Sequence, residues 1–248
     1  MKARVVEAGN GWQWIVDGFA LFRKYPLMWI ALTVVMVLIW MVSFLIPLVG
    51  PLLFNLLSPV LFAGLMIGCK AVENGEELEL PHLFAGFKKN PTALVTIGGI
   101  YLVGTILVVG IVFLAAGGSM LPAVLDKSGD MHAMASAVRS MAFGLLVGFA
   151  LYLPLLMLIW FAPLLVVFHD LNPVEAMKAS FFACLSNWLP FLIYGLIILV
   201  LWFIASIPLF LGLVVLLPVL ICSVYTSYKD IFTGAEPKPA TGGNPFLR

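Results

Sequence analysis

Charged side chains are scarce in this chain. Of its 248 residues, 10% are charged and 63% are hydrophobic. A soluble globular domain has roughly 25% charged residues, so an ordinary water-solvated fold is excluded. The formal net charge of +1 provides no basic excess to neutralise phosphates, and we expect no nucleic-acid partner. Lipid must therefore solvate most of the surface.

Motifs for catalysis or cofactor binding are also lacking. The three cysteines, Cys69, Cys184 and Cys222, have no CxxC or Cys/His spacing, which favours free, small apolar side chains over a disulfide framework or a metal site. The chain has no Gly-rich phosphate loop, no GxSxG elbow and no HExxH pair. We expect no enzymatic activity, no cofactor and no metal.

Two small groups of polar residues are the nearest approach to acid/base or metal chemistry. They are His82 with Glu76, Glu77 and Glu79, and His169 with Asp170. Neither has the spacing of metal ligands on one helix. Acidic residues close to a membrane surface are usually solvated loop residues, and we favour that interpretation.

Long uncharged runs dominate what is present. They cover residues 25–69, 90–125, 140–168 and 179–228. Because a helix needs ~20 apolar residues to cross ~30 Å of hydrocarbon, the first and last runs are long enough for two spans each. Pro and Gly at 47–51 and Pro at 206–208 predict turns within them. The prediction is an all-α membrane protein with six transmembrane helices.

A hydrophilic loop is expected between the third and fourth spans. It contains Asp126, Lys127, Asp130, His132 and Arg139. Lys and Arg are concentrated in cytoplasmic loops, so a count of six spans can be checked by their distribution. Lys127 and Arg139 fall on one side. The other side receives Lys2, Arg4, Arg23, Lys24, Lys70, Lys88, Lys89, Lys178, Lys229, Lys238 and Arg248. This bias predicts that both termini are cytoplasmic.

A threefold internal repeat is visible before the odd-numbered spans. Its copies are residues 18–29 (GFALFRKYPLMW), 83–94 (LFAGFKKNPTAL) and 181–192 (FFACLSNWLPFL). Pro26, Pro91 and Trp188 align. The repeat predicts a single membrane domain (1–233) of three hairpins at about 10–74, 75–170 and 171–233, followed by a disordered cytoplasmic tail at 234–248.

Each hairpin is expected to follow an interfacial amphipathic helix. The apolar stripes are Trp12, Ile15, Val16, Phe19 and Phe22 in the first copy and Leu80, Leu83, Phe84 and Phe87 in the second. Asn10 and Asn172 each precede Gln or Glu by three residues, which predicts N-caps for the first and third of these helices. Such stripes more often have a structural than a binding role.

The spans offer two kinds of structural site. Pro59, Pro163 and Pro218 each precede three apolar residues in a returning span and predict helix kinks, which are either structural or the wall of a cavity. The glycine pairs Gly64/Gly68 and Gly144/Gly148 predict close helix packing, within one chain or between chains. Polar groups for a transport site are few. They are Asn55, Ser58, Tyr101, Thr105, Ser206 and Ser223.

Two basic pairs, Arg23-Lys24 and Lys88-Lys89, lie where a pre-span helix meets its span. Each such charge contributes ~1 kcal/mol beside anionic lipid, so the four residues are candidates for contacting lipid headgroups. Positive-inside orientation requires the same residues and is the more common use of such charges.

The repeated pattern, with GFALFRKYP and LFAGFKKNP as its best copies, resembles a broad group of uncharacterised six-span bacterial inner-membrane proteins. It is similar, more distantly, to the membrane domain attached to some glycerophosphodiester phosphodiesterases. The resemblance covers residues 10–232 and implies a bacterial inner-membrane location. It implies no catalytic residue, because nothing in this chain corresponds to the phosphodiesterase portion.

Two functional hypotheses follow. The first is a non-enzymatic membrane module that binds membrane lipids, a protein partner or a second copy of itself through its helical bundle and pre-span helices. The alternative is a small-solute or lipid transporter with a midplane cavity between proline-kinked helices. The sequence does not identify the ligand.

Overall fold

The computed structural model describes residues 3–125 and 131–234, which are helical and contain no strand. These residues form two compact units, considered separately below. Unit 1 comprises residues 3–35, 65–82 and 182–234, and unit 2 comprises 36–64, 83–125 and 131–181. Asp126, Lys127, Asp130 and the expected tail, apart from residue 234, lie outside the described residues.

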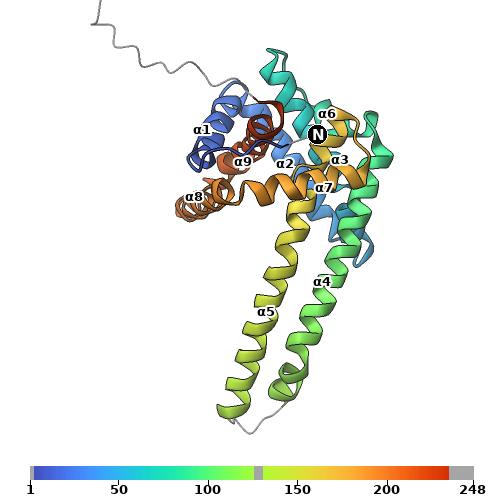
Figure 1. Cartoon of the computed structure of the whole chain (residues 1–248), viewed down its shortest axis with the longest axis vertical. Helices are drawn as coiled ribbons and strands as arrows, with labels where there is room; N and C mark the ends of the chain where they lie inside the picture. The colour runs from blue at the N-terminus through green and yellow to red at the C-terminus, as the bar shows by residue number, and fades with distance from the viewer. Residues whose placement is uncertain (1–2, 126–130, 235–248) are drawn as a thin grey trace, which may run out of the picture. The chain divides into compact units, whose positions relative to one another are not determined.

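The described part of the chain contains nine α-helices and two helices of other types (Figure 1). The α-helices are α1 (Asn10–Phe22), α2 (Pro26–Ser43), α3 (Val49–Glu73), α4 (Pro91–Leu125), α5 (Met131–Ile159), α6 (Ala162–His169), α7 (Pro173–Ser186), α8 (Trp188–Ser206) and α9 (Leu213–Tyr228). A 3₁₀ helix, η1 (Leu80–Lys88), precedes α4, and a π-helical turn, η2 (Lys229–Thr233), follows α9.

Six helical segments of the described residues are long and apolar enough to cross a bilayer. They are Pro26–Ser43, Val49–Glu73, Pro91–Ala116, Met134–His169, Trp188–Ser206 and Leu213–Thr233. Proline occupies the first position of α2 and α4, where its missing N–H costs no helical hydrogen bond. The prediction of an all-α membrane protein with six spans is confirmed.

The turns within the first and third span pairs fall where proline and glycine predicted them. α2 ends at Ser43 and α3 begins at Val49, whereas α8 ends at Ser206 and α9 begins at Leu213. A Cβ atom on Gly50 would collide with the backbone carbonyl of Ser43, and one on Gly212 would lie 2.6 Å from the Cα of Ala205. Both turns therefore require glycine, for steric reasons.

The fourth span differs from the prediction, because the kink expected at Pro163 is a complete break. α5 ends at Ile159, and Pro163 lies in the first turn of the separate helix α6. A buried hydroxyl explains the break. Ser180 Oγ accepts a hydrogen bond from the Phe161 N–H (2.9 Å) and donates one to the Met157 carbonyl (2.6 Å). The serine thus occupies the place of the helical bond between residues 157 and 161.

The hydrophilic loop before the fourth span is shorter than predicted. His132 and Arg139 lie inside α5, which begins at Met131. Residues 131–139 contain neither Gly nor Pro and are rich in Ala and Met, so they extend the helix beyond the uncharged run. Arg139 is exposed, and its long side chain can keep its charge in a polar environment at a membrane edge.

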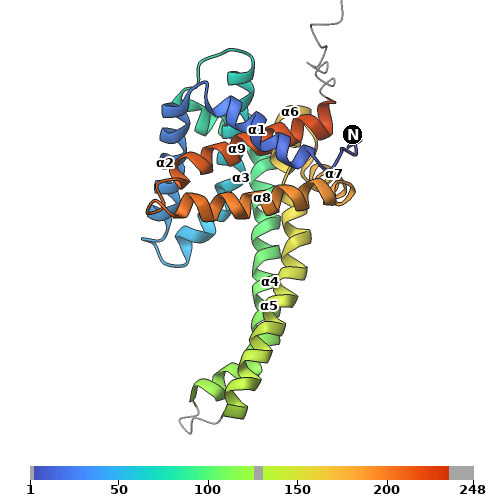
Figure 2. The same ribbon diagram turned by 90° about the vertical axis from the view of Figure 1, so that its left-hand side faces the viewer.

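In unit 2, α4 and α5 run side by side as a long hairpin (Figures 1 and 2). A Cβ atom on Gly144 would lie 2.7 Å from the Ala116 Cβ, and one on Gly148 would lie 2.8 Å from a Val112 methyl. Both glycines of the pair therefore face the neighbouring helix α4 of the same chain, and their role in helix packing stays a prediction.

The other pair, Gly64 and Gly68, is buried in α3. In unit 1, a Cβ atom on Gly68 would lie 2.9 Å from a Leu78 methyl. This glycine therefore allows close packing of the segment after α3, and not of another span.

The core of unit 1 is built around α1, which packs against α9 and the start of α8 (Figure 1). A Cβ atom on Gly18 would meet the Ser223 backbone at 2.7 Å, and one on Gly11 would collide with the Pro190 carbonyl. The Trp14 carbonyl accepts a hydrogen bond from Thr226 Oγ1 (2.8 Å). Contacts at successively earlier residues of α1 reach successively later residues of α9, so the two helices are antiparallel.

Candidate functional site

α1 presents two apolar faces instead of the single stripe predicted from sequence. Ile15 and Phe22 are buried inside unit 1 together with Trp14, whereas Val16 and Phe19 are exposed. Trp12, the first member of the stripe, is exposed on the same side as Val16. The pattern of one wide stripe could not separate the two faces, because the partner of the inner face lies at the other end of the chain. Only the outer face is available for lipid or a partner.

The apolar side chains of the second pre-span segment, η1, are likewise divided between a buried and an exposed side. Leu83 is fully buried, and Leu80, Phe84 and Phe87 are exposed. The exposed rings of Phe84 and Phe87 lie 6.4 Å apart. The segment is a 3₁₀ helix, so the α-helical spacing assumed from sequence is wrong in detail. Exposed aromatic groups still precede the basic pair.

The two predicted N-caps have different outcomes. Asn172 Oδ1 accepts a hydrogen bond from the Glu175 N–H (2.9 Å), which confirms this residue as the cap of α7. Asn10 is not a cap. It is the first residue of α1, and its side-chain amide donates to Asp230 Oδ2 (2.7 Å).

Asp230, in η2, receives side chains from the start of the chain. Its Oδ2 accepts hydrogen bonds from Asn10 and from Trp14 Nε1 (2.9 Å), and its Oδ1 forms an ion pair with Arg4 (2.6 Å). A partly buried carboxylate with three donors is well satisfied. Asp230 therefore ties residues 4–14 to the end of α9, and sequence inspection offered no signal for it.

Asn187, between α7 and α8, forms hydrogen bonds with the backbone of this N-terminal segment. Its Oδ1 accepts from the Val6 N–H (2.8 Å), and its amide donates to the carbonyls of Arg4 (2.9 Å) and Ala183 (2.9 Å). The residue is fully buried. Its amide thus provides the hydrogen bonds that a neighbouring strand would give to an extended segment.

A second carboxylate joins α3 and α9 within unit 1. Glu73 Oε2 accepts a hydrogen bond from the Tyr225 hydroxyl (2.7 Å), and its Oε1 pairs with the Lys229 ammonium. One turn earlier on each helix, the thiols of Cys69 and Cys222 are fully buried. All three cysteines are buried, as expected for small apolar side chains.

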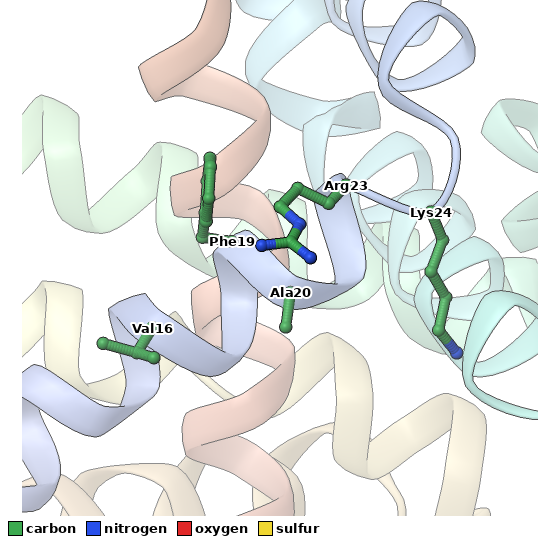
Figure 3. A pocket seen from close by; sticks show the side chains of 5 residues that line it. All are labelled: Val16, Phe19, Ala20, Arg23 and Lys24. Carbon is green, nitrogen blue, oxygen red and sulfur yellow. The ribbon is translucent and has the colours of Figure 1, made fainter.

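The basic pair Arg23-Lys24 lies in the short connection between α1 and α2, beside an open hollow of about 410 Å³ (Figure 3). Its lining residues are Val16, Phe19, Ala20, Arg23 and Lys24. The Arg23 guanidinium lies 5.9 Å from the centroid of the Phe19 ring. Lys24 points away from Arg23 and donates to the Val72 carbonyl (3.0 Å), near the end of α3. The two cations therefore have different environments.

The other basic pair, Lys88-Lys89, lies at the end of η1 in unit 2, and both side chains are exposed. Asn90 follows with a φ of 56°, a conformation that Asn tolerates, and turns the chain into α4. This pair has the same position relative to its span as the first pair has to α2.

Pro59 and Pro218 lie inside α3 and α9, as predicted. Pro59 has no N–H to donate to the carbonyl of Asn55. Ser58 Oγ donates to that carbonyl instead (3.0 Å), so the carbonyl remains satisfied within its own helix. This arrangement favours the structural interpretation of Pro59 over a ligand-binding one.

The polar side chains of the spans mostly bond locally. Asn55 donates to the Pro51 carbonyl (3.0 Å), and Ser206 donates to the Trp202 carbonyl (2.7 Å), each within its own helix. Elsewhere, hydroxyl groups pair across neighbouring helices. These pairs are Tyr101 with Tyr152 (2.7 Å) in unit 2 and Ser223 with Tyr194 (2.6 Å) in unit 1.

The acidic and histidine groups outside the spans form no metal site in the described part of the chain, where no cluster of three or more His, Cys, Asp or Glu could hold an ion. His82 Nδ1 lies 3.0 Å from the Glu79 backbone nitrogen, so the ring makes a local contact within its own segment.

The chain is 31% identical, over 264 aligned residues, to the probable inner membrane protein BTH_II0599 of Burkholderia thailandensis. The alignment covers 96% of each of the two proteins. No protein-family model matches the chain, and no solved structure matches it. The likeness therefore extends over nearly the whole length of this probable inner membrane protein.

Proposed function

The chain belongs to the family of the probable inner membrane protein from Burkholderia thailandensis, and we propose that it is a non-enzymatic membrane module that binds anionic lipid or a protein partner. Binding occurs through the outward faces of its pre-span helices. The membrane location rests on the relative and on the six apolar helices. The binding role rests on the features described next.

One observation carries the proposal. In both units, exposed aromatic side chains lie within about one helical turn before a basic pair at the start of a span. Phe19 precedes Arg23-Lys24, and Phe84 and Phe87 precede Lys88-Lys89. Aromatic groups favour the membrane interface, and cations there attract anionic headgroups. The same combination recurs although one helix is α and the other is 3₁₀.

The orientation is proposed from charge and contact together. Eleven of the 13 Lys and Arg residues fall on one side of a six-span arrangement. Within unit 1, the Arg4 N–H donates to the Ile231 carbonyl (2.8 Å), so the beginning of the described chain and the end of the last span lie at the same edge. Both ends are cytoplasmic if the basic side faces inward.

A transporter with a midplane cavity has less support. Such a site needs polar groups whose bonding capacity is open to a substrate. Asn55, Ser58 and Ser206 instead bond carbonyls of their own helices. Saturable flux of a solute or lipid in reconstituted vesicles would favour the transporter over the binding module.

The threefold repeat and the distant similarity to the membrane domain of glycerophosphodiester phosphodiesterases remain predictions. Three contacts within the units support a repeated arrangement. α1 meets α9 at Gly18, η1 meets α3 at Gly86, and α7 meets α5 at Ser180. Each pre-span helix thus packs on the returning span of another hairpin.

The test neutralises the four cations together in the intact protein, as Arg23→Gln, Lys24→Gln, Lys88→Gln and Lys89→Gln. Native mass spectrometry after gentle extraction then measures the anionic lipids and proteins retained. We expect their retention to fall at least tenfold, since four charges contribute ~1 kcal/mol each near an anionic surface.

Two controls make this result interpretable. Arg139→Gln removes an exposed cation from α5 and leaves retention unchanged. A terminal reporter fusion verifies that the fourfold variant keeps its topology, because the same charges orient the spans. Unchanged retention with unchanged topology would refute the proposed binding role.

A further inference from the structure

The hollow beside α1 has a lining of mixed character. Val16, Phe19, Ala20 and Arg23 are spaced three, four and seven residues apart, so they share one face of the helix (Figure 3). All four side chains are exposed. Three of them form an apolar wall, and Arg23 and Lys24 supply positive charge at its end.

The two cations of this site are not equivalent. Lys24 donates to the Val72 carbonyl, so it serves to hold the end of α3 to the connection between α1 and α2. Arg23 has no carboxylate partner among the residues that the structure describes. Its guanidinium lies instead over the Phe19 ring at 5.9 Å. A cation–π contact uses the face of the guanidinium and leaves its N–H edges available to a ligand.

Five N–H donors in a planar fork match the geometry of phosphate and carboxylate groups, which they can bind through two parallel hydrogen bonds. Among the described residues that line the hollow, two are cationic and none is acidic. α2 begins at Pro26, three residues after Arg23, so the site lies where a span starts. Leu27, on the first turn of α2, is almost fully exposed and is available to acyl chains.

We propose that this hollow binds the phosphate group of an anionic phospholipid, with Arg23 as the contacting residue. Phe19 positions the guanidinium, and the apolar wall of α1 covers the glycerol region. The inference rests on the proposed function and assigns its lipid contact to one site in unit 1. A lipid is favoured over soluble phosphate because a soluble ion would gain nothing from three apolar lining residues.

The test titrates the full-length protein with phosphatidylglycerol and with phosphatidylethanolamine of the same acyl chains, and native mass spectrometry counts the bound molecules. The wild type should prefer phosphatidylglycerol. Arg23→Gln should lower phosphatidylglycerol binding about fivefold, the equivalent of ~1 kcal/mol, and leave phosphatidylethanolamine binding unchanged. Arg23→Lys keeps the charge but loses the fork, so it should recover only part of the binding.

Further variants distinguish a direct contact of the lipid with Arg23 from a general effect of positive charge. Phe19→Leu keeps an apolar wall but removes the ring under Arg23, and should weaken phosphatidylglycerol binding. Lys178→Gln removes an exposed cation from α7 and should have no effect. The buried cysteines provide a thiol-reactivity assay that verifies folding of every variant.

Three results would overturn the site. In the first, Arg23→Gln binds phosphatidylglycerol as the folded wild type does while the fourfold variant loses it. This result would retain the proposed function and place the contact elsewhere. If neither variant loses lipid, both proposals fail. Displacement of phosphatidylglycerol by equimolar inorganic phosphate, without dependence on acyl chains, would assign the hollow to a soluble anion.

Discussion

Trp14 donates its indole N–H to the Asp230 carboxylate, with 2.9 Å between Nε1 and Oδ2, across 216 residues of sequence. Trp29 is also fully buried, yet its indole nitrogen has no hydrogen-bond partner in the described part of the chain. These two tryptophans of unit 1 therefore differ in whether the indole N–H has a hydrogen-bond acceptor. One donor is satisfied by a charged acceptor, and the other incurs its desolvation cost without compensation.

Replacing each of these tryptophans by phenylalanine should give different changes in stability. Trp14→Phe removes a bond to a charged group and should lower the free energy of unfolding by about 1.5–3 kcal/mol. Trp29→Phe removes an unpaired donor, and this gain offsets the packing lost with the smaller ring. The free energy of unfolding should therefore change by less than about 1 kcal/mol. Thiol reactivity during thermal unfolding measures both, and equal losses would contradict the account.

Ser180→Ala should destabilise the junction between α5 and α6. The hydroxyl bonds both the Phe161 N–H and the Met157 carbonyl, so its loss leaves buried backbone groups to re-pair or remain unsatisfied. We expect a loss of about 1–3 kcal/mol in thermal unfolding experiments. Ser43→Ala is the matched control, since that exposed hydroxyl bonds only the Trp40 carbonyl of its own helix. Equal effects of the two changes would disprove the role of Ser180.

Asn187→Ala should release the first residues of the chain. The amide makes hydrogen bonds with the backbones of Arg4 and Val6, and their loss favours local opening. Tryptic cleavage after Arg4, followed by intact mass, should accelerate about tenfold, the equivalent of ~1.4 kcal/mol. Asn55→Ala, which removes an amide bonded inside α3, should leave this rate unchanged. A rate like that of the wild type would show that other contacts hold the segment.

Glycine substitutions should distinguish close packing from open surface in the α4–α5 hairpin. Gly144→Val and Gly148→Val place side chains against Ala116 and Val112, and overpacking should cost about 1–3 kcal/mol each. Gly110→Val meets no atom within 4 Å and should be neutral or slightly stabilising, because valine has the higher helix propensity. Thermal unfolding of the three variants provides the comparison. A stable Gly148→Val protein would exclude tight packing at that position.

Most of the architecture was predictable because the bilayer restricts the choices. Uncharged runs of span length permit only helices, and two of the turns contain the prolines and glycines that interrupt them. The break after Ile159 was not predictable, since it depends on a hydroxyl group from another helix. Ser180 resembles any other serine in the sequence, and Pro163 alone suggested only a kink.

The cations of the candidate site were predictable from the sequence, but the different contacts that they make were not. The sequence places Arg23 and Lys24 together at a membrane edge. It could not show that Lys24 bonds the Val72 carbonyl, because that contact depends on how the end of α3 packs. Likewise, the outer face of α1 could not be distinguished from the inner face without knowing that Trp14 reaches Asp230.

The long separation between Trp14 and Asp230 also has a consequence for biogenesis. A ribosome adding roughly 5–20 residues per second makes the second residue about 10–40 s after the first. During that interval, the inner face of α1 has no covering, and Trp14, Gly18 and Phe22 are open to insertion factors and quality-control proteases. Completion of η2 closes this face, so the newborn protein is protected only when its last span has been made.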